Sequence, residues 1–591
     1  MAMNSALSRT TGALIIALTF FPLILAHGNS HDEAEMDGHR GQHHESDNPK
    51  DDTEYPPSYF SHPDHVGAIH AHIAVMTLAW VFILPVAVVL SLARSRYTLV
   101  LQFAFLVTNA VGLLVGTIYN DQTPDLYPNN SHHKLGWVVT WIVIAQVLIG
   151  TVGWVAGAVA RTTNLSDNVT HAFLPVPTDA PHDSQYRILD DYRSSNPYRA
   201  SDDSGQGTEP NTESLRNSSV STLDGVDDIQ LQSPQKEYGE EPDDLESVSL
   251  SSPIPKTAIG RHAARVVASR VWRYLDIATQ VVDRTILPLG FVSLATGIVT
   301  FGRFFEGDEI FGGLAHWVKG GVFFWLGLFT LGRWSGSFAE VGWAWNVRPK
   351  RSGRKWWPSA EFVESALIFL YGSTNIFLEH LSGWGGEWKP RDMEHISITI
   401  LFIGGGLCGM LVESTRIRDL LNTTADETEF DHPYHNDEVK QSSSPETYEF
   451  SLNPIPALVI LMLGIMMSSH TQSTRTSSLV HQQWGNLLLG ASFARGLTYV
   501  LLFLKPPKSV LPSRPPTELL ASFGLISGGI IFMASAGDTV QGMIHYNMDA
   551  MFMYTVTMGL VGSLMAWEVI VLAIKGWAVR RERYRESHRI V

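Results

Sequence analysis

Apolar segments of about 20 residues recur along the whole chain, and they constrain its fold more than any other feature of the sequence. A helix of this length crosses the ~30 Å hydrocarbon core of a lipid bilayer. About 11 such segments are present, at residues 66–92, 99–118, 135–159, 286–304, 316–331, 360–381, 396–411, 454–467, 479–504, 519–534 and 551–574. We therefore expect an all-α, polytopic helical membrane protein whose first partner is the lipid bilayer.

Polar segments before and between these spans divide the chain further. Residues 1–26 have one basic residue and an apolar stretch that is short for a span, which predicts a secretory signal peptide or, alternatively, an uncleaved signal anchor. Residues 27–65 form a His-rich, acidic tail. Residues 161–258 are rich in Ser, Asp, Glu, Asn and Gln. Such a segment buries too little apolar area to offset its ordering entropy, so we expect a disordered cytosolic linker.

Two membrane domains flank this linker: three spans in residues 66–160 and eight spans in residues 284–591. Between the linker and the second domain, basic and apolar residues alternate at helical spacing over residues 259–283. This pattern predicts an amphipathic helix on the inner leaflet or an ordinary helix leading into the next span. Pro85 lies inside the first span, where we expect it to kink the helix.

The basic residues predict the orientation in the membrane. Lys and Arg in short loops collect on the cytosolic side. With the N-terminus outside, the inner connections carry twenty basic residues, Arg333 among them, and the outer connections carry five. We expect the C-terminus and the linker in the cytosol, in a multi-pass protein of the secretory pathway, the plasma membrane or the vacuole.

Composition excludes several classes of function. The single cysteine, Cys408, allows neither a disulfide framework nor a cysteine-based metal site. A formal net charge of -16 argues against a nucleic-acid partner. The chain has no P-loop, no G-x-S-x-G and no dinucleotide fingerprint, which leaves open whether it is an enzyme.

Histidines at the ends of the spans all fall on the predicted outer side. They are His70, His72, His132, His133, His316, His380, His395, His470, His481 and His545. A lone histidine at a membrane interface is more often a hydrogen-bonded helix end than a ligand. Imidazole is also the commonest protein ligand of transition metals and haem iron, and the one-sided distribution favours such a role.

Two stretches of the first domain resemble the cytochrome b-561 family. They are HAHIAVMTLAWVFILPVAVVLSLARS, which contains His72, Trp80 and Pro85, and HHKLGWVVTWIVIAQVLIG, which begins at His132. The resemblance implies electron transport, with His72 and His132 as axial ligands of haem b and imidazole nitrogens ~4 Å apart across the iron. The span between them has no histidine, and Gln102 stands near the expected position. At most one haem is therefore implied here.

The rest of the chain resembles a fungal family of yeast transmembrane proteins. The stretch RTILPLGFVSLATGIVTFGRFFEGDEIFGGLAHWVKGGVFFWLGLFTLGRWSGSFAEVGWAWNVRP carries the likeness, which extends over about residues 285–574 and into the three-span domain. It implies a fungal multi-span protein and assigns no activity.

Carboxylates and histidines also suggest metal sites. Glu379 and His380 end one span, while Glu394 and His395 open the next, so a four-ligand N/O site or a hydrogen-bond network between the helices is expected there. Removal of the signal peptide after Ala26 would leave His27 as the first residue, whose amine and imidazole suit copper or zinc.

Charged residues also fall inside the predicted spans, toward the inner half. Glu364, Arg495 and Glu568 are costly there, and we expect a structural pair between arginine and carboxylate.

The sequence thus leaves three hypotheses for function. The first is a one-haem b-type electron-transfer protein acting on an extracytoplasmic redox partner. The second is binding or transport of a transition metal without redox chemistry. The third is a structural membrane protein.

Overall fold

The computed structural model describes residues 56–162, 270–307, 309–349, 357–381, 390–430, 448, 450–470 and 472–588. The chain forms two compact units, residues 1–153 with 269–591, and residues 154–268. Only residues 154–162 of the second unit are described, so the account below concerns the first. The predicted signal peptide, most of the predicted tail and nearly all of the predicted linker lie outside the described residues.

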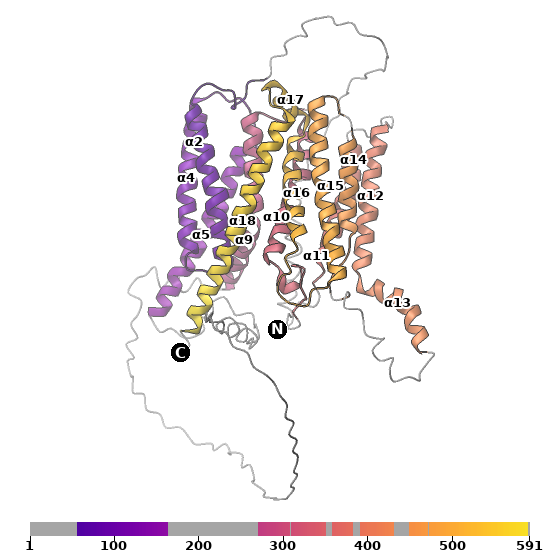
Figure 1. Cartoon of the computed structure of the whole chain (residues 1–591). Coiled ribbons are helices and arrows are strands. Elements are labelled where there is room, and N and C mark those ends of the chain that lie inside the picture. Colours follow the sequence, from indigo (N-terminus) through magenta and orange to yellow (C-terminus); the bar gives the residue numbers. More distant parts are fainter. Residues whose placement is uncertain are drawn as a thin grey trace, which may run out of the picture. The chain divides into compact units, whose positions relative to one another are not determined.

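No described residue forms a strand, and the helices stand side by side (Figure 1). The N-terminal part of the bundle consists of α2 (Val66–Thr77), the π-helical η1 (Leu78–Ile83), α3 (Leu84–Leu92), α4 (Thr98–Gln122), α5 (His132–Thr162) and α9 (Arg270–Gly302).

The C-terminal part continues with α10 (Glu309–Ser335), the short 3₁₀ helix η2 (Ala339–Val341), α11 (Ala360–Leu381), α12 (Pro390–Glu413), α13 (Thr415–Phe430), α14 (Ile455–Ser469), α15 (Arg475–Leu504), α16 (Pro516–Ala534), α17 (Gly537–His545) and α18 (Ala550–Ser587). Among the described residues, nine helices are long and apolar enough to cross a membrane, and α14 is a shorter apolar helix. The all-α membrane fold is therefore confirmed, and each predicted span coincides with a helix.

Helices α2, α5, α10 and α15, which carry His72, His132, His316 and His481, begin at one end of the bundle, the upper end in Figure 1. Contacts between the connecting segments hold this end together: Arg303 Nη1 donates to the carbonyl oxygen of Pro57 at 3.0 Å, and the backbone N–H of Phe305 donates to Asp538 Oδ2 at 2.6 Å. The start of α2, the end of α9 and the start of α17 consequently lie close together.

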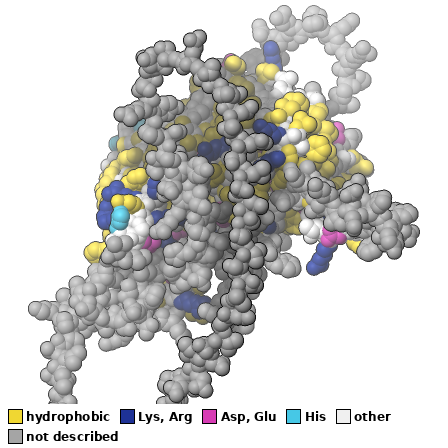
Figure 2. Space-filling view, turned by 60° about the horizontal axis from the view of Figure 1, so that its bottom comes forward, with side chains coloured by type: hydrophobic (Ala, Val, Ile, Leu, Met, Phe, Trp, Pro, Cys, Tyr) yellow, Lys and Arg dark blue, Asp and Glu magenta, His cyan; other side chains and the backbone are white. Residues whose placement is uncertain are grey.

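The lower end carries exposed basic side chains. Figure 2, which brings this end forward, shows Lys and Arg side chains beside hydrophobic ones. Arg94, Arg96, Lys505 and Lys508 are exposed in the connections there. This distribution is what the predicted cytosolic position of the lower end requires, and the orientation itself stays a prediction.

Pro85 alters the first span as its chemistry dictates. Proline has no N–H to give to the carbonyl four residues earlier, which is that of Val81. The helix passes through the π-helical turn Leu78–Ile83 just before Pro85. Trp567 Nε1 of α18 donates to the Val81 carbonyl oxygen at 2.9 Å, so the freed acceptor has a partner inside the bundle.

The predicted amphipathic helix over residues 259–283 is not a separate element where it is described. Helix α9 runs without a break from Arg270 to Gly302. Its Asp283 is buried and accepts from Ser91 Oγ at 2.7 Å and from Gln146 Nε2 at 2.6 Å. Two polar partners inside the bundle make this position tolerable for a carboxyl group, so this part of α9 packs into the bundle as a helix leading into the next span does. Residues 259–269 of the predicted helix lie outside the described residues.

Candidate functional site

His72 of α2 and His132 of α5 face each other near the upper end of the bundle. Their ring centroids are 6.4 Å apart, and the ring planes are nearly perpendicular at 85°. The sequence-based expectation that these residues meet is confirmed. It rested on two spans that start at the same end, with one span between them to return the chain.

Each ring is oriented by a hydrogen bond that its Nδ1 makes to a backbone carbonyl oxygen of another helix. His72 Nδ1 lies 2.8 Å from the carbonyl oxygen of Gly112 on α4. His132 Nδ1 lies 3.2 Å from the carbonyl oxygen of Ser293 on α9 and 3.4 Å from Thr296 Oγ1. A carbonyl oxygen only accepts, so Nδ1 carries the proton in both rings and Nε2 keeps its lone pair. This arrangement is typical of metal-ligating histidines.

Two glycines leave room for the rings. A Cβ atom at Gly116 of α4 would lie 2.6 Å from His72 Nδ1, and one at Gly297 of α9 would lie 3.0 Å from His132 Cε1. Any other residue at Gly116 would displace the His72 ring or the helix. Sequence reasoning did not find these glycines, because a glycine in a span usually indicates only close helix packing.

The separation of the rings can be compared with the separations that two ligands of one metal would show. For two imidazoles bound to a metal at about 2.05 Å, with ring centres about 1.15 Å behind the nitrogens, a linear arrangement puts the centres about 6.4 Å apart. A tetrahedral angle would put the two centres about 5.2 Å apart. The observed 6.4 Å equals the separation of the linear arrangement, in which both Nε2 atoms face one metal from opposite sides; the centroid distance alone does not fix the direction of the two Nε2 atoms.

A polar chain fixes the helices just below the pair. Trp80 Nε1 donates to Asn109 Oδ1 at 2.9 Å, and Asn109 Nδ2 donates to Thr140 Oγ1 at 3.2 Å. The Trp80 ring also lies where a side chain at Gly290 of α9 would be. Four helices are thereby held in register around the histidines. Gln102, expected near a missing ligand, is buried in the core of this group.

The other predicted metal ligands are not brought together among the described side chains. Glu394 is exposed and His395 is half-buried, while the side chains of Glu379 and His380 lie outside the described residues, as does His27. No group of three or more His, Cys, Asp or Glu residues with metal-binding geometry occurs in the described part of the chain. The cluster and the copper or zinc site stay predictions.

A buried network of charged side chains connects four helices toward the lower end. Arg333 of α10 donates to Glu361 at 2.8 Å and to Glu364 at 3.1 Å, both on α11. Arg495 of α15 donates to Glu364 at 3.0 Å and to Glu518 of α16 at 3.1 Å. Each of the five side chains is at most 6% exposed. The network therefore ties these four helices together inside the apolar bundle.

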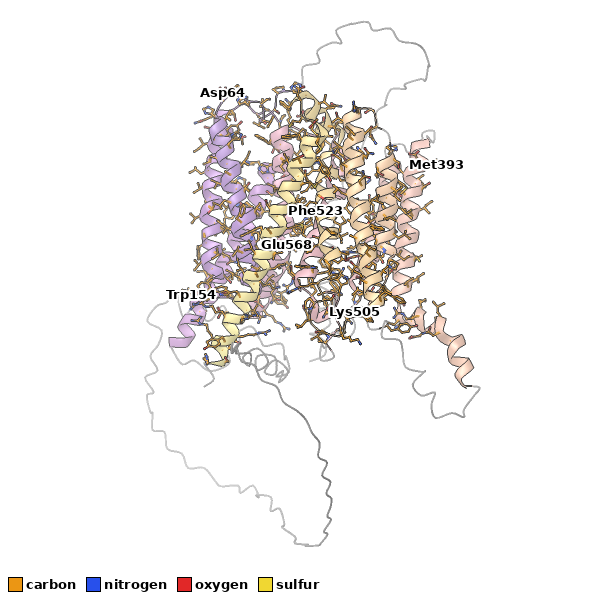
Figure 3. All side chains as sticks on the ribbon, in the orientation of Figure 1. Asp64, Trp154, Met393, Lys505, Phe523 and Glu568 are labelled. Carbon is orange, nitrogen blue, oxygen red and sulfur yellow. The ribbon has the colours of Figure 1, made fainter. Side chains whose placement is uncertain are left out.

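The network extends and corrects the expectation from sequence. The predicted pair of Glu364 and Arg495 is confirmed. Arg333, counted among the basic residues of the inner connections, is instead buried, because Glu361 and Glu364 on the next helix accept from it. Glu568 does not join the network: it lies at the middle of α18 (Figure 3), and its Oε2 has no hydrogen-bond partner among the described residues.

Comparison with known proteins finds relatives over most of the chain. Residues 289–576 match the family described as Protein YTP1-like, C-terminal, and residues 53–155 match a domain of unknown function, DUF2427. A Schizosaccharomyces pombe protein described as an uncharacterized membrane protein is 33% identical over 523 residues, which cover 86% of this chain and 94% of that protein.

Two proteins of Saccharomyces cerevisiae match shorter regions. One, also described as an uncharacterized membrane protein, is 41% identical over 307 residues, 50% of this chain and 47% of that protein. The other, Protein YTP1, is 25% identical over 178 residues, 30% of each chain. No solved structure matches the chain. These matches support the resemblance to fungal transmembrane proteins, while the resemblance to cytochrome b-561 stays a prediction.

Proposed function

We propose that this chain, which belongs to the YTP1-like family of membrane proteins, is a b-type electron-transfer protein whose haem is held by His72 and His132. The observation that supports this most is the opposed pair of imidazoles, with centres 6.4 Å apart and each Nδ1 bonded to a backbone carbonyl oxygen. Two imidazoles on opposite sides of one metal are the axial ligands that a b-type haem takes.

The donor set suits haem iron in its chemistry as well as its geometry. A carbonyl acceptor on each Nδ1 fixes the tautomer and raises the basicity of Nε2. Met76 lies one turn below His72 and beside Gly112, so the pair has an apolar neighbour on that side, while the Thr296 hydroxyl lies near His132 on the other. Haem bound there would supply one-electron transfer, and the position near the upper end would give a partner access from that side.

A difference spectrum tests the proposal. Protein purified in detergent from a haem-sufficient yeast host should show the reduced-minus-oxidised bands of low-spin haem b. H72A and H132A should each lose these bands. The matched controls H70A and H133A change exposed histidines within two residues of the pair and should keep them. Wild-type protein without haem, or equal spectra in all four variants, would contradict the proposal.

One observation favours binding or transport of a transition metal without redox chemistry. Polar side chains continue below the pair, through the buried Asn109 and Thr140 and then, nearer the lower end, through the buried Gln146 and Asp283 and the half-buried Ser91. A transport path needs such groups along the bilayer. Iron, copper and zinc content of the same purified protein separates the two functions, because transport predicts metal without haem that is lost in H72A.

A further inference from the structure

A second pair of histidines, His316 of α10 and His481 of α15, repeats the geometry of the first. Their ring centroids are 6.1 Å apart and their planes make an angle of 87°, against 6.4 Å and 85° for the first pair. His316 is the eighth residue of its helix and His481 the seventh, and both helices begin at the upper end. Each pair therefore joins two helices that begin at the upper end, one pair in the N-terminal part of the bundle and the other in the C-terminal part.

As in the first pair, each ring of the second pair is oriented by a hydrogen bond between its Nδ1 and a backbone carbonyl oxygen. His316 Nδ1 lies 2.8 Å from the carbonyl oxygen of Gly312, and His481 Nδ1 lies 2.9 Å from that of Ser477. Both acceptors are four residues earlier on the same helix. A carbonyl partner at Nδ1 assigns the proton to that atom and the lone pair to Nε2, as in the first pair.

Helix α16 sets the distance between the two rings, because it packs against both helices that carry them. Gly320 of α10 lies against the backbone of Gly529 on α16, and a Cβ atom on Gly320 would be 2.6 Å from the Gly529 carbonyl oxygen. On the other side, a Cβ atom on Gly524 of α16 would be 2.9 Å from the carbonyl oxygen of Leu487 on α15. The backbones can approach this closely only because these positions lack side chains.

Aromatic side chains surround the pair. Trp484 and Phe532 stack with centroids 4.1 Å apart, and Phe532 lies 5.6 Å from the His316 ring. The indole N–H groups of Trp484 and Trp317 are buried and have no hydrogen-bond partner among the described residues. Buried donors are normally satisfied, and the Trp484 ring lies 6.0 Å from the His481 ring, so an acceptor for the Trp484 indole N–H would lie close to the pair.

We propose that His316 and His481 hold a second transition-metal centre through two opposed imidazole nitrogens. With the bond lengths used for the first pair, a separation of 6.1 Å corresponds to an angle at the metal of about 145°, far wider than the tetrahedral angle of structural zinc sites. This bent arrangement suits a two-coordinate copper(I) ion as it stands, and it suits the axial ligands of haem iron once the ring centres move about 0.3 Å apart to the linear arrangement. The identity of the metal rests on the function proposed for the first pair. The existence of a metal site at His316 and His481 does not depend on that function.

The test counts metal centres in the purified full-length protein. Haem per chain is measured from the absorbance of the pyridine complex, and iron and copper per chain by mass spectrometry. Wild type should hold two equivalents, H481G one, H72A one, and the double variant H72A/H481G none. H545A changes an exposed histidine of α17 and should keep two. Haem in step with iron identifies the centre as haem, and copper without haem identifies a bare ion.

His481 is 7% exposed, so its removal could unfold the protein, and His316 is the less buried member of the pair. H316G should also lose one equivalent, and added imidazole should restore it by filling the space of the missing ring. Two equivalents retained in both H316G and H481G would overturn the second site.

The two proposals fail separately. A single equivalent that is lost in H72A and kept in H316G and H481G leaves the first centre alone and overturns the second. A single equivalent with the opposite dependence leaves the second alone. Wild-type protein without metal overturns both.

Discussion

Removal of Arg495 is expected to destabilise the protein more than any other single charge change on α15. Its guanidinium donates to both oxygens of Glu364, to Glu518 Oε2 from two nitrogens, and to Thr330 Oγ1 at 2.8 Å. Glu518 is 0% exposed and has no other hydrogen-bond partner among the described residues. R495Q would therefore leave this carboxylate buried beside Glu364 without its cation.

The magnitude follows from the number of groups left unpaired. Two arginines and three glutamates make the network formally -1, and R495Q makes it -2. Breaking a buried ion pair by removing one partner costs about 3–5 kcal/mol. E518Q in the same chain restores the charge balance, so R495Q/E518Q should recover about half of that loss.

Equilibrium unfolding in mixed micelles of a mild detergent and dodecyl sulfate, followed by tryptophan fluorescence, measures these differences. R475Q is the matched control, because Arg475 begins the same helix and is exposed, and it should lie within about 0.5 kcal/mol of wild type. If R495Q stays within about 1 kcal/mol of R475Q, the network does not stabilise the fold as argued.

Three further changes test other parts of the structure. G116A and G297A should each lower the haem or metal content at least twofold while the protein stays folded, because the new methyl group occupies space now held by a ligand ring. Unchanged haem or metal content would show that the rings tolerate displacement. W567F should cost about 1 kcal/mol in the same unfolding assay, since it leaves the Val81 carbonyl oxygen without its indole donor, and a neutral effect would mean that water or another donor replaces it. Deletion of residues 27–44 should lower the stoichiometry of Cu²⁺ or Zn²⁺ binding measured by titration, and unchanged binding would leave that segment as a spacer.

The first histidine pair could be predicted from sequence because its geometry depends on little more than span order. His72 and His132 start spans that run in the same direction, and one span lies between them. The second pair could not be predicted this way. His316 and His481 are 165 residues apart with several helices between them, and the lateral order of helices in a bundle is not written in hydropathy. It follows from close packing at glycines such as Gly320, which a sequence shows without their partners.

The charged network could also be predicted from the sequence only in part. Hydropathy placed Glu364 and Arg495 within spans, so a pair between them could be inferred. Arg333 stands at the end of an apolar run, where basic residues normally mark a cytosolic loop. Its burial depends on Glu361 and on the loop that returns the chain, where the carbonyl oxygen of Trp343 accepts from Arg333 Nε at 2.6 Å. A pattern of residue types carries no information about such a loop.

The position of the two histidine pairs bears on what their metal centres could do. Both pairs belong to helices that begin at the upper end. The rings are carried by the turns closest to that end and not by the middle of the spans. Electron transfer across a bilayer requires centres on opposite sides, whereas two centres toward the same end of the bundle exchange electrons on one side of the membrane. The charged groups described toward the lower end include the exposed basic residues of the connections and the buried network of arginines and glutamates, and none of these carries electrons. Two metal centres in this bundle would therefore serve a donor and an acceptor on the same side, and each His72 or His481 variant should slow electron exchange with partners added to that side only.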